Sequence, residues 1–363
     1  SFVYSDHFFG GTMSWQVVEP NRTEIKLQQT YSWFDNLASC QRISGPTGNL
    51  TFFNGTNFGA SYISIQGQCT NYDFYLQFLT LKNIKSLIYP SNTTIILAFP
   101  TAFWKNFIPG SPRCSLVTFI NLTRRDDNKQ INSSPITSMP AIITLPIGTR
   151  QIIRIPMIDI DRDIAECRWA INNSTYYYTP KMDECGGICQ NLPNAQLITS
   201  SNLDNNCTLI ANISTVGYYA IAIQIEDFMP SAPYYPLSSI PLQFVIRGIN
   251  DSCYSPAIIG QIDNDATIVV FPNTPFSTSI IAKTGCNQTK ITKFSSDMLP
   301  LGVTSTSSVI RQNASIYSMI FTWTPTVDQI GTTQLYCTIA NDDSNKQSTQ
   351  YCLNFVVTEK IGE

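Results

Sequence analysis

Apolar residues in this chain recur at every second position, and that spacing limits the folds it can adopt. The pattern is clearest at residues 13–17, 25–27, 219–225, 242–246, 317–323 and 353–357. Period two places alternate side chains on one face of a β-strand, and no stretch of a dozen residues keeps the 3.6-residue period of an amphipathic helix. Clusters of Pro, Gly, Asn and Ser separate the segments, which is typical of turns. The sequence therefore predicts an all-β fold of tandem antiparallel β-sandwiches.

The length and the linker composition predict three domains. A chain of 363 residues is too long for a single core. Polar, proline-marked segments at 132–140 and 247–256 read as links between domains. We expect an N-terminal β-sandwich at 1–135, with a jelly roll as one alternative, and two further β-sandwiches at 136–249 and 250–363.

Asn-x-Ser/Thr sequons are unusually dense. The chain has 28 Asn and 72 Ser or Thr among 363 residues, so chance placement gives roughly 5 to 6 sequons. The chain has more than twice that number of sequons, at Asn21, Asn49, Asn54, Asn92, Asn121, Asn132, Asn172, Asn173, Asn206, Asn212, Asn250, Asn287 and Asn313. This density predicts N-glycosylation in the secretory pathway.

The charge content excludes some partners and suits an extracellular protein. Only 13% of residues are charged and the net charge is −3, without a Lys/Arg-rich stripe, which argues against nucleic acid and anionic membrane surfaces. No apolar run is long enough to span a bilayer. The sequence opens at Ser1 without a leader, so we expect a mature secreted product cut from a longer precursor.

Eleven cysteines are spread along the chain without clustered Cys-x-x-Cys pairs, which favours disulfides over zinc. In the third domain we expect Cys286 to pair with Cys337 across the sandwich and Cys253 to pair with Cys352. In the second domain the four cysteines Cys167, Cys185, Cys189 and Cys207 allow three pairings. In the first, Cys40 and Cys69 are expected to pair, which leaves Cys114 as a free thiol or as a bridge to another chain.

Calcium is the one cofactor that the sequence suggests. Asp159, Asp161 and Asp163 alternate along one segment, and hard oxygen ligands at such spacing suit Ca²⁺. The alternative is solvated turn carboxylates whose repulsion is relieved by Arg154, Arg162 or Arg168. The segment 249–251 also resembles the calcium-binding linker between cadherin repeats, although it lacks most of the acids of that motif.

Catalytic motifs are largely missing, so we expect no enzyme. His7 is the single histidine, which makes a Ser-His-Asp triad, a Cys-His dyad or a His-based zinc site difficult to assemble. Paired carboxylates of the glycosidase type need no fixed spacing. Asp73, Asp126, Asp127 and Glu184 are the candidates for that chemistry.

Several motifs resemble modules of known extracellular proteins. The N-terminal Gly-Gly-Thr-Met-Ser-Trp at 10–15, with the segments 31–33, 122–127 and 131–135, is similar to the first module of modular extracellular β-sandwich glycoproteins of invertebrates and protists. The second module of those proteins resembles segments 167–170, 184–189, 207–209, 224–228 and 236–244. Segment 321–331 is similar to the penultimate-strand motif of cadherin-like and immunoglobulin-like repeats. The resemblance implies tandem β-sandwiches in an extracellular glycoprotein, without a defined activity. It also implies that the sandwiches at 136–249 and 250–363 are immunoglobulin-like or cadherin-like.

Two functions fit these features. The first is a secreted structural protein that polymerises head to tail into a fibre or sheath through β-edges and through the terminal segments 1–9 and 354–358. The second is an adhesion or receptor ectodomain. In either case the surfaces for a partner are expected in the sequon-free stretches near 69–82, 214–249 and after 315. Tyrosine clusters at 176–178 and 234–235 are weaker candidates for an interaction surface.

Overall fold

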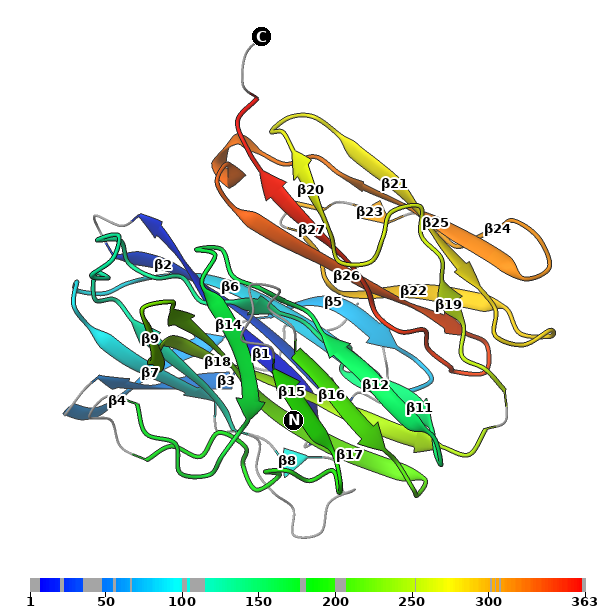
Figure 1. Ribbon diagram of the computed structural model, residues 1–363, viewed down its shortest axis with the longest axis horizontal. Coiled ribbons are helices and arrows are strands. Elements are labelled where there is room, and N and C mark those ends of the chain that lie inside the picture. Colours follow the sequence, from blue (N-terminus) through cyan, green and yellow to red (C-terminus); the bar gives the residue numbers. More distant parts are fainter. Residues whose placement is uncertain are drawn as a thin grey trace, which may run out of the picture. The chain divides into compact units, whose positions relative to one another are not determined.

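A computed structural model gives the fold of the chain, shown in Figure 1. It describes residues 7–19, 23–34, 48–54, 57–65, 67–99, 103–104, 115–176, 181–199, 207–251, 253–300, 302–303, 305–306 and 308–360. The chain divides into two compact units. The first comprises Ser1–Ile142, Arg150–Asn212 and Gly217–Arg247, and the second comprises Ile143–Thr149, Ile213–Val216 and Gly248–Glu363.

The described residues are built from β-strands, as the period-two pattern predicts. The strands up to residue 249 are β1 (His7–Glu19), β2 (Glu24–Phe34), β3 (Gly48–Asn54), β4 (Asn57–Ile65), β5 (Gln68–Asp73), β6 (Phe78–Ile88), β7 (Thr94–Phe99), β8 (Phe103–Trp104), β9 (Leu116–Asn121), β10 (Ile136–Thr137), β11 (Ile142–Pro146), β12 (Arg150–Ile155), β13 (Met157–Ile158), β14 (Ile164–Trp169), β15 (Gln196–Thr199), β16 (Cys207–Asn212), β17 (Gly217–Met229) and β18 (Ala232–Ile249).

One large sheet joins the two N-terminal domains that the sequence predicts. Its strand order is β4-β3-β7-β9-β18-β1-β2-β6-β5, and β14 and β17 extend it through β18 (Figure 1). The strand β18 belongs to the expected second domain, yet it lies between β9 and β1 of the expected first domain. The expected boundary at 135 therefore differs from the structure, because a shared sheet makes one compact unit of residues on both sides of it. The expected boundary at 249 lies close to Gly248, where the main segment of the second unit begins.

The Gly-Gly-Thr motif in β1 makes this joined sheet possible. A Cβ atom at Gly10 would lie 2.0 Å from the carbonyl oxygen of Gln243 on β18, and one at Gly11 would lie 2.3 Å from the carbonyl oxygen of Thr30 on β2. Gly10 also has a φ of +128°, a conformation that other residues rarely adopt. Two glycines are therefore needed where β18, β1 and β2 approach one another.

The core of the first unit uses the apolar face of β1. Met13 and Trp15 are fully buried, as their alternation predicts. Phe8 and Phe9 are buried as well, and Phe8 lies edge-to-face against Trp104, with ring centroids 5.3 Å apart. The expected role of segment 1–9 as a docking strand for another copy is thus wrong for its described part, because Phe8 and Phe9 fill the core of their own unit. Residues 1–6 lie outside the described residues.

A three-stranded sheet, β12-β16-β15, completes the sandwich of residues 136–249. The disulfide Cys167–Cys207 connects β14 of the large sheet to the first residue of β16, with 5.9 Å between the Cα atoms. Buried Ile155 and Leu209 line the inner face of the small sheet. This bridge links the two layers of the sandwich.

The second unit is a sandwich of the immunoglobulin type. Its elements are β19 (Ala257–Ile258), β20 (Ala266–Val270), β21 (Phe276–Lys283), β22 (Ile291–Met298), β23 (Ser305–Thr306), β24 (Ile310–Arg311), β25 (Ile316–Trp323), η2 (Val327–Gln329), β26 (Thr333–Asp342) and β27 (Tyr351–Val357). One sheet has the order β19-β21-β25-β23 and the other β20-β27-β26-β22. This division of strands is that of immunoglobulin domains.

Aromatic rings fill the core of the second unit. Phe321 stacks on Tyr336 with ring centroids 4.1 Å apart, and Trp323 lies edge-to-face against Phe355 at 5.2 Å. The strand β27 pairs with β26 on one side and, in parallel, with β20 on the other. The expected use of segment 354–358 as a docking edge is therefore wrong, because both edges of that strand are already paired within the unit.

The disulfides of the second unit differ from the expected pairs. Cys253 bonds to Cys286, and Cys337 bonds to Cys352. Cys337 and Cys352 lie directly opposite each other on the neighbouring strands β26 and β27, with 4.1 Å between their Cα atoms. The expected bridges Cys286–Cys337 and Cys253–Cys352 are wrong because both cysteines of the hairpin face each other within one sheet.

Candidate functional site

Two buried networks of charged side chains lie in the first unit. They bring together most of the motifs that the sequence singles out in its first two modules. One is centred on Arg168 and the other on Arg125, and we name them the Arg168 cluster and the Arg125 cluster.

The Arg168 cluster holds one guanidinium between two glutamates. The Nη1 and Nη2 atoms of Arg168 donate to the two carboxylate oxygens of Glu184 at 2.7 and 2.9 Å, and Nε and Nη2 donate to Oε1 of Glu226 at 3.0 and 2.7 Å. The hydroxyl of Tyr176 donates to Glu184 as well. The side chain of Glu184 is fully buried. This is the bidentate geometry that Arg favours with carboxylates.

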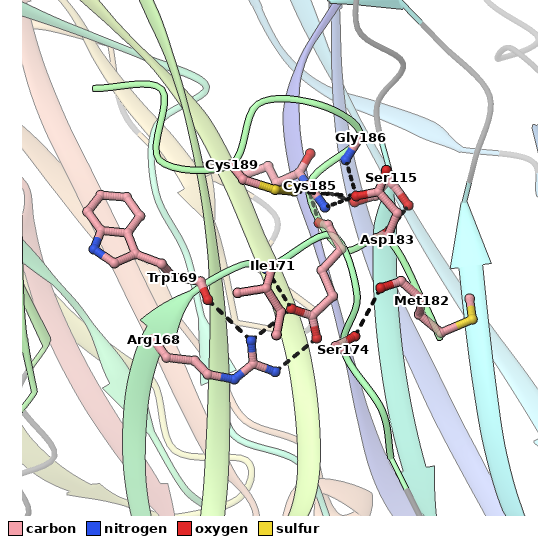
Figure 2. The surroundings of a disulfide bond; sticks show 12 residues. Ser115, Arg168, Trp169, Ile171, Ser174, Met182, Asp183, Cys185, Gly186 and Cys189 are labelled. Carbon is pink, nitrogen blue, oxygen red and sulfur yellow. Dashed lines mark hydrogen bonds and ion pairs between the residues drawn. A yellow bond between two sulfur atoms is a disulfide. The ribbon is translucent and has the colours of Figure 1, made fainter. Parts of the chain in front are cut away.

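Sheet register and one loop assemble this cluster. Arg168 on β14 lies opposite Gln224 on β17, so Glu226, two residues further along β17, is its diagonal neighbour. Glu184 comes from the segment that follows β14, where the backbone N–H of Ile171 also donates to it at 3.0 Å. Figure 2 shows the guanidinium of Arg168 directed toward this segment, which the disulfide Cys185–Cys189 closes on itself.

The protonation states of Arg168 and Tyr176 in this cluster are fixed by burial and by neighbouring charges. Burial opposes the charge of Arg168, but its hydrogen bond to Glu184 and the charge of Glu226 outweigh burial and raise its pKa. Burial, followed by the charge of Glu184, raises the pKa of Tyr176 well above its usual value. The cluster therefore contains a permanent cation, two partnered carboxylates and a neutral phenol, an arrangement that suits structure better than proton transfer.

The Arg125 cluster connects the loop after β9 to the second module. Arg125 donates to both carboxylate oxygens of Asp163 and of Asp127, and its Nη1 also donates to Oδ1 of Asn132 at 3.2 Å. The amide of Asn132 in turn donates to Oδ2 of Asp227 at 2.6 Å. The side chains of Arg125 and Asp163 are each only 4% exposed. One arginine therefore organises carboxylates from three separate segments.

Two buried carboxyls of this cluster, Asp227 and Asp159, have raised pKa values. Asp227 is fully buried and accepts hydrogen bonds from the backbone N–H and hydroxyl of Ser238 and from Asn132. Burial nevertheless raises its pKa to about 7. Burial, followed by the charge of Asp227, raises the pKa of Asp159 well above its usual value. Oδ1 of Asp159 accepts from the N–H of Asp163, while its buried Oδ2 has no hydrogen-bond partner among the described residues.

The expected calcium ligands do not converge in this cluster. Asp163 is held by Arg125, Asp161 accepts from the backbone N–H of Ser133 at 2.6 Å, and Asp159 accepts from the N–H of Asp163. Three oxygen ligands of one Ca²⁺ ion must lie within a few ångströms of one another. Among the described residues, these three side chains do not form such a group. As arranged, they do not fit calcium, and calcium binding stays a prediction.

The carboxylate of the linker also has a cationic partner. Oδ2 of Asp251 lies 2.9 Å from Nζ of Lys346, whose side chain is 4% exposed. An ammonium group thus lies where the resemblance to cadherin linkers places calcium.

One group in the described part of the chain does bring three metal-type ligands together. Asp183, Cys185 and Cys189 hold one ligand atom each within 4.8 Å of one another. Both sulfurs belong to the disulfide Cys185–Cys189, and Oδ1 of Asp183 accepts from the backbone N–H groups of Cys185 and Gly186. Metal binding needs thiolates, so the group acts as a turn stabilised by a disulfide.

The remaining cysteines are only partly described. Cys69 is disulfide-bonded. Its expected partner Cys40, and Cys114, lie outside the described residues.

The candidate glycosidase carboxylates are engaged elsewhere. Glu184 is held by Arg168, and Asp127 by Arg125. Asp73 accepts from the backbone N–H groups of Tyr75 and Leu76 in its own turn. Asp126 is fully exposed, beside Lys129. The side chain of His7 lies outside the described residues.

Most sequon asparagines whose side chains are described lie at the surface. Asn121 is half-buried, and exposed side chains are found at Asn92, Asn172, Asn173, Asn212, Asn250, Asn287 and Asn313. Asn21 and Asn206, and the side chains of Asn49 and Asn54, lie outside the described residues. Asn132 is the exception, since it is 1% exposed and joins Arg125 to Asp227. Its amide is not accessible in this fold, and glycosylation at Asn132 stays a prediction.

Sequence reasoning missed the centre of the Arg125 cluster. It named Arg154, Arg162 and Arg168 as the cations that relieve the acidic segment, whereas the structure uses Arg125, which is distant in sequence from Asp163. One signal was available. Charged residues are scarce in this chain, and Arg125 lies within one of the motifs that carry the resemblance.

Comparisons with known proteins give no family. No family model matches the chain, and no curated protein matches it. Three solved structures are among the matches. Titin domains Z1Z2 in complex with telethonin are 11% identical over 63% of this chain and 98% of that one, with a TM-score of 0.20. The sialic acid binding region of a Streptococcus sanguinis adhesin is 8% identical over 62% and 78%, also at 0.20.

The third, Dpr2 immunoglobulin domains in complex with DIP-Theta, is 10% identical over 92% and 94%, at a TM-score of 0.20. TM-scores at this level do not establish a shared fold or function. The class of the protein follows from its own strands, which define an all-β chain of β-sandwiches. No helix among the described residues is long and apolar enough to cross a membrane.

Proposed function

We propose that this chain is a secreted, N-glycosylated structural protein whose copies join into an extracellular fibre through a sequon-free sheet edge. The observation that carries the proposal is the hairpin of β5 and β6, an exposed aromatic tip on the end strand of the large sheet. The resemblance of the two N-terminal modules to extracellular glycoproteins supports the same compartment. The buried ion clusters serve this function by holding the modules as one unit.

Disulfides and exposed sequons support passage through the secretory pathway. Four disulfides lie in the described residues, and such bonds persist mainly in oxidising compartments. Seven of the nine sequon asparagines with described side chains are exposed. Glycans on them would keep a chain with few charges soluble and would confine protein contacts to surfaces without sequons.

The β5–β6 tip is such a surface. Tyr72, Phe74 and Tyr75 are 47%, 68% and 63% exposed, and the rings of Phe74 and Tyr75 lie 5.9 Å apart, edge to face. Strand β5 is the last strand of the large sheet as described. An end strand can add a strand of another chain, and adjacent exposed aromatics are typical anchors of protein interfaces.

The test is assembly of the secreted protein with and without this tip. Phe74→Ser with Tyr75→Ser should abolish fibres in negative-stain microscopy and leave a monomer in sedimentation velocity, with the melting temperature unchanged. Tyr254→Ser is the matched control, since Tyr254 is 83% exposed in the second unit. Fibres that persist in the double variant would remove the tip from the contact.

An adhesion ectodomain is the second candidate, favoured by one observation. Tyr234 and Tyr235, the third and fourth residues of β18, are 86% and 65% exposed in the sequon-free stretch 214–249. Exposed tyrosines suit binding of a different protein as well as of another copy. A wild-type protein that is monomeric at every concentration would contradict the fibre and leave adhesion as the better proposal.

A further inference from the structure

The outer face of the small sheet carries an apolar patch. Ile152 on β12 and Ile198 on β15 are 57% and 49% exposed. Ile152 lies opposite Ile210 on the central strand β16, and Ile198 lies opposite Thr208 on the same strand. Side chains that lie opposite each other, or two residues apart along a strand, share one face of a sheet. Ile152, Ile210 and Ile198 therefore form one surface, which we name the isoleucine patch.

A sequon borders this patch. Asn212 is the exposed last residue of β16. It follows Ile210 by two positions, so it projects from the same face about 7 Å along the strand. Asn212 lies opposite Arg150 on β12, which makes Ile152 its diagonal neighbour, at about 7–8 Å. Figure 1 shows β12, β16 and β15 side by side.

We propose that an N-linked glycan on Asn212 folds over the isoleucine patch, with its first N-acetylglucosamine packed on Ile210 and Ile152. This inference rests on the secreted, glycosylated protein proposed above. A sugar ring exposes C–H groups on its faces and its acetamido group ends in a methyl, so contact with the isoleucines removes apolar surface from water. The linkage through Asn212 keeps the sugar close, which lowers the entropic cost of that contact.

The sequon at Asn287 offers a matched comparison. Its asparagine is exposed in the loop between β21 and β22 and not on a strand face. A glycan there has no strand to orient it toward an apolar patch. The two sites therefore separate an effect of packing from a general effect of glycosylation.

The experiment measures melting temperatures of protein secreted from a eukaryotic cell line and trimmed to single N-acetylglucosamine stubs. Asn212→Gln and Ser214→Ala remove the same glycan by changing different atoms. Each should lower the melting temperature by about 2–4 °C, the size expected for loss of one modest surface contact in a unit of this size. Asn287→Gln should change it by less than about 1–2 °C.

A double-variant cycle tests the contact itself. Ile152→Thr shrinks the patch but keeps a β-branched residue in the strand. In that background Ser214→Ala should lower the melting temperature by no more than half as much as in the wild type. An equal loss in both backgrounds, or no loss in the wild type, overturns the inference.

Peptide mapping separates this inference from the function on which it rests. If Asn212 is unmodified while other exposed sequons carry glycans, the inference fails and the proposed secreted glycoprotein stands. If no sequon carries a glycan, both fail.

Discussion

At the residue scale, Asp159 and Asp227 make the first unit sensitive to pH. Both carboxyls have raised pKa values in the folded protein, so the folded state keeps protons that the unfolded chain releases near pH 4. Their stabilisation is complete below about pH 4 and is lost as the pH rises, for Asp227 through about 7. We expect the free energy of unfolding to fall between pH 5 and pH 7.5 by up to about 1.4 kcal/mol per pH unit for each carboxyl. Melting temperatures measured across this range should fall with it.

Asp159→Asn should weaken that dependence. The substitution removes a buried like charge beside Asp227, together with the acceptor Oδ2, which has no hydrogen-bond partner in the described part of the chain. We expect the variant to be about 1–3 kcal/mol more stable than the wild type at pH 7.5 and nearly equal to it at pH 5. Asp126→Asn, at a fully exposed carboxyl, is the control. Parallel pH profiles for Asp159→Asn and the wild type would show that Asp159 does not titrate as proposed.

Arg168 gives a second prediction at this scale. Arg168→Ala leaves Glu184, which is fully buried, without its cation. Breaking a buried pair in this way costs about 3–5 kcal/mol, measured as a lower urea midpoint with unchanged slope. Lys129→Ala breaks the exposed pair with Asp126 and should cost less than about 1 kcal/mol. Equal losses in the two variants would mean that burial of Glu184 does not set the cost.

At the element scale, β26 and β27 fix the disulfides of the second unit. Cys337 lies opposite Cys352 in their register, so we expect non-reduced peptide maps to show the pairs Cys253–Cys286 and Cys337–Cys352. Replacing both Cys337 and Cys352 by Ala should cost about 3 kcal/mol, since the bridge closes a short loop. Recovery of a Cys286–Cys337 peptide would contradict the structure and restore the pairing expected from sequence.

At the scale of the whole molecule, β18 decides which fragments fold. The strand lies between β9 and β1, so residues 1–135 alone leave two neighbouring strands without their partner. We expect the fragment 1–135 to be insoluble or unfolded by circular dichroism, whereas 1–249 should melt cooperatively. A cooperative, monomeric 1–135 fragment would show that the first module does not need β18.

Much of the fold could be predicted from the sequence, because strand periodicity is a local property. Met13 and Trp15 on β1, and Phe321 and Trp323 on β25, are buried as their alternation predicts. The candidate site was harder to predict from the sequence. The alternating acids at 159–163 are indeed gathered in one cluster, but its cation Arg125 and its bridging amide Asn132 come from a distant segment. No spacing rule connects these residues.

The sequence by itself determined the strand content, the cysteine number and the positions of the sequons, since each depends on residues close together in the chain. The tertiary structure decided what those residues do. It buried Asn132 within an ion network, paired Cys337 with Cys352 across a hairpin and inserted β18 into the sheet of the N-terminal module. Each of these outcomes depends on which strands become neighbours. Strand pairing joins residues far apart in the chain, and the alternation within one strand does not specify which strand becomes its neighbour.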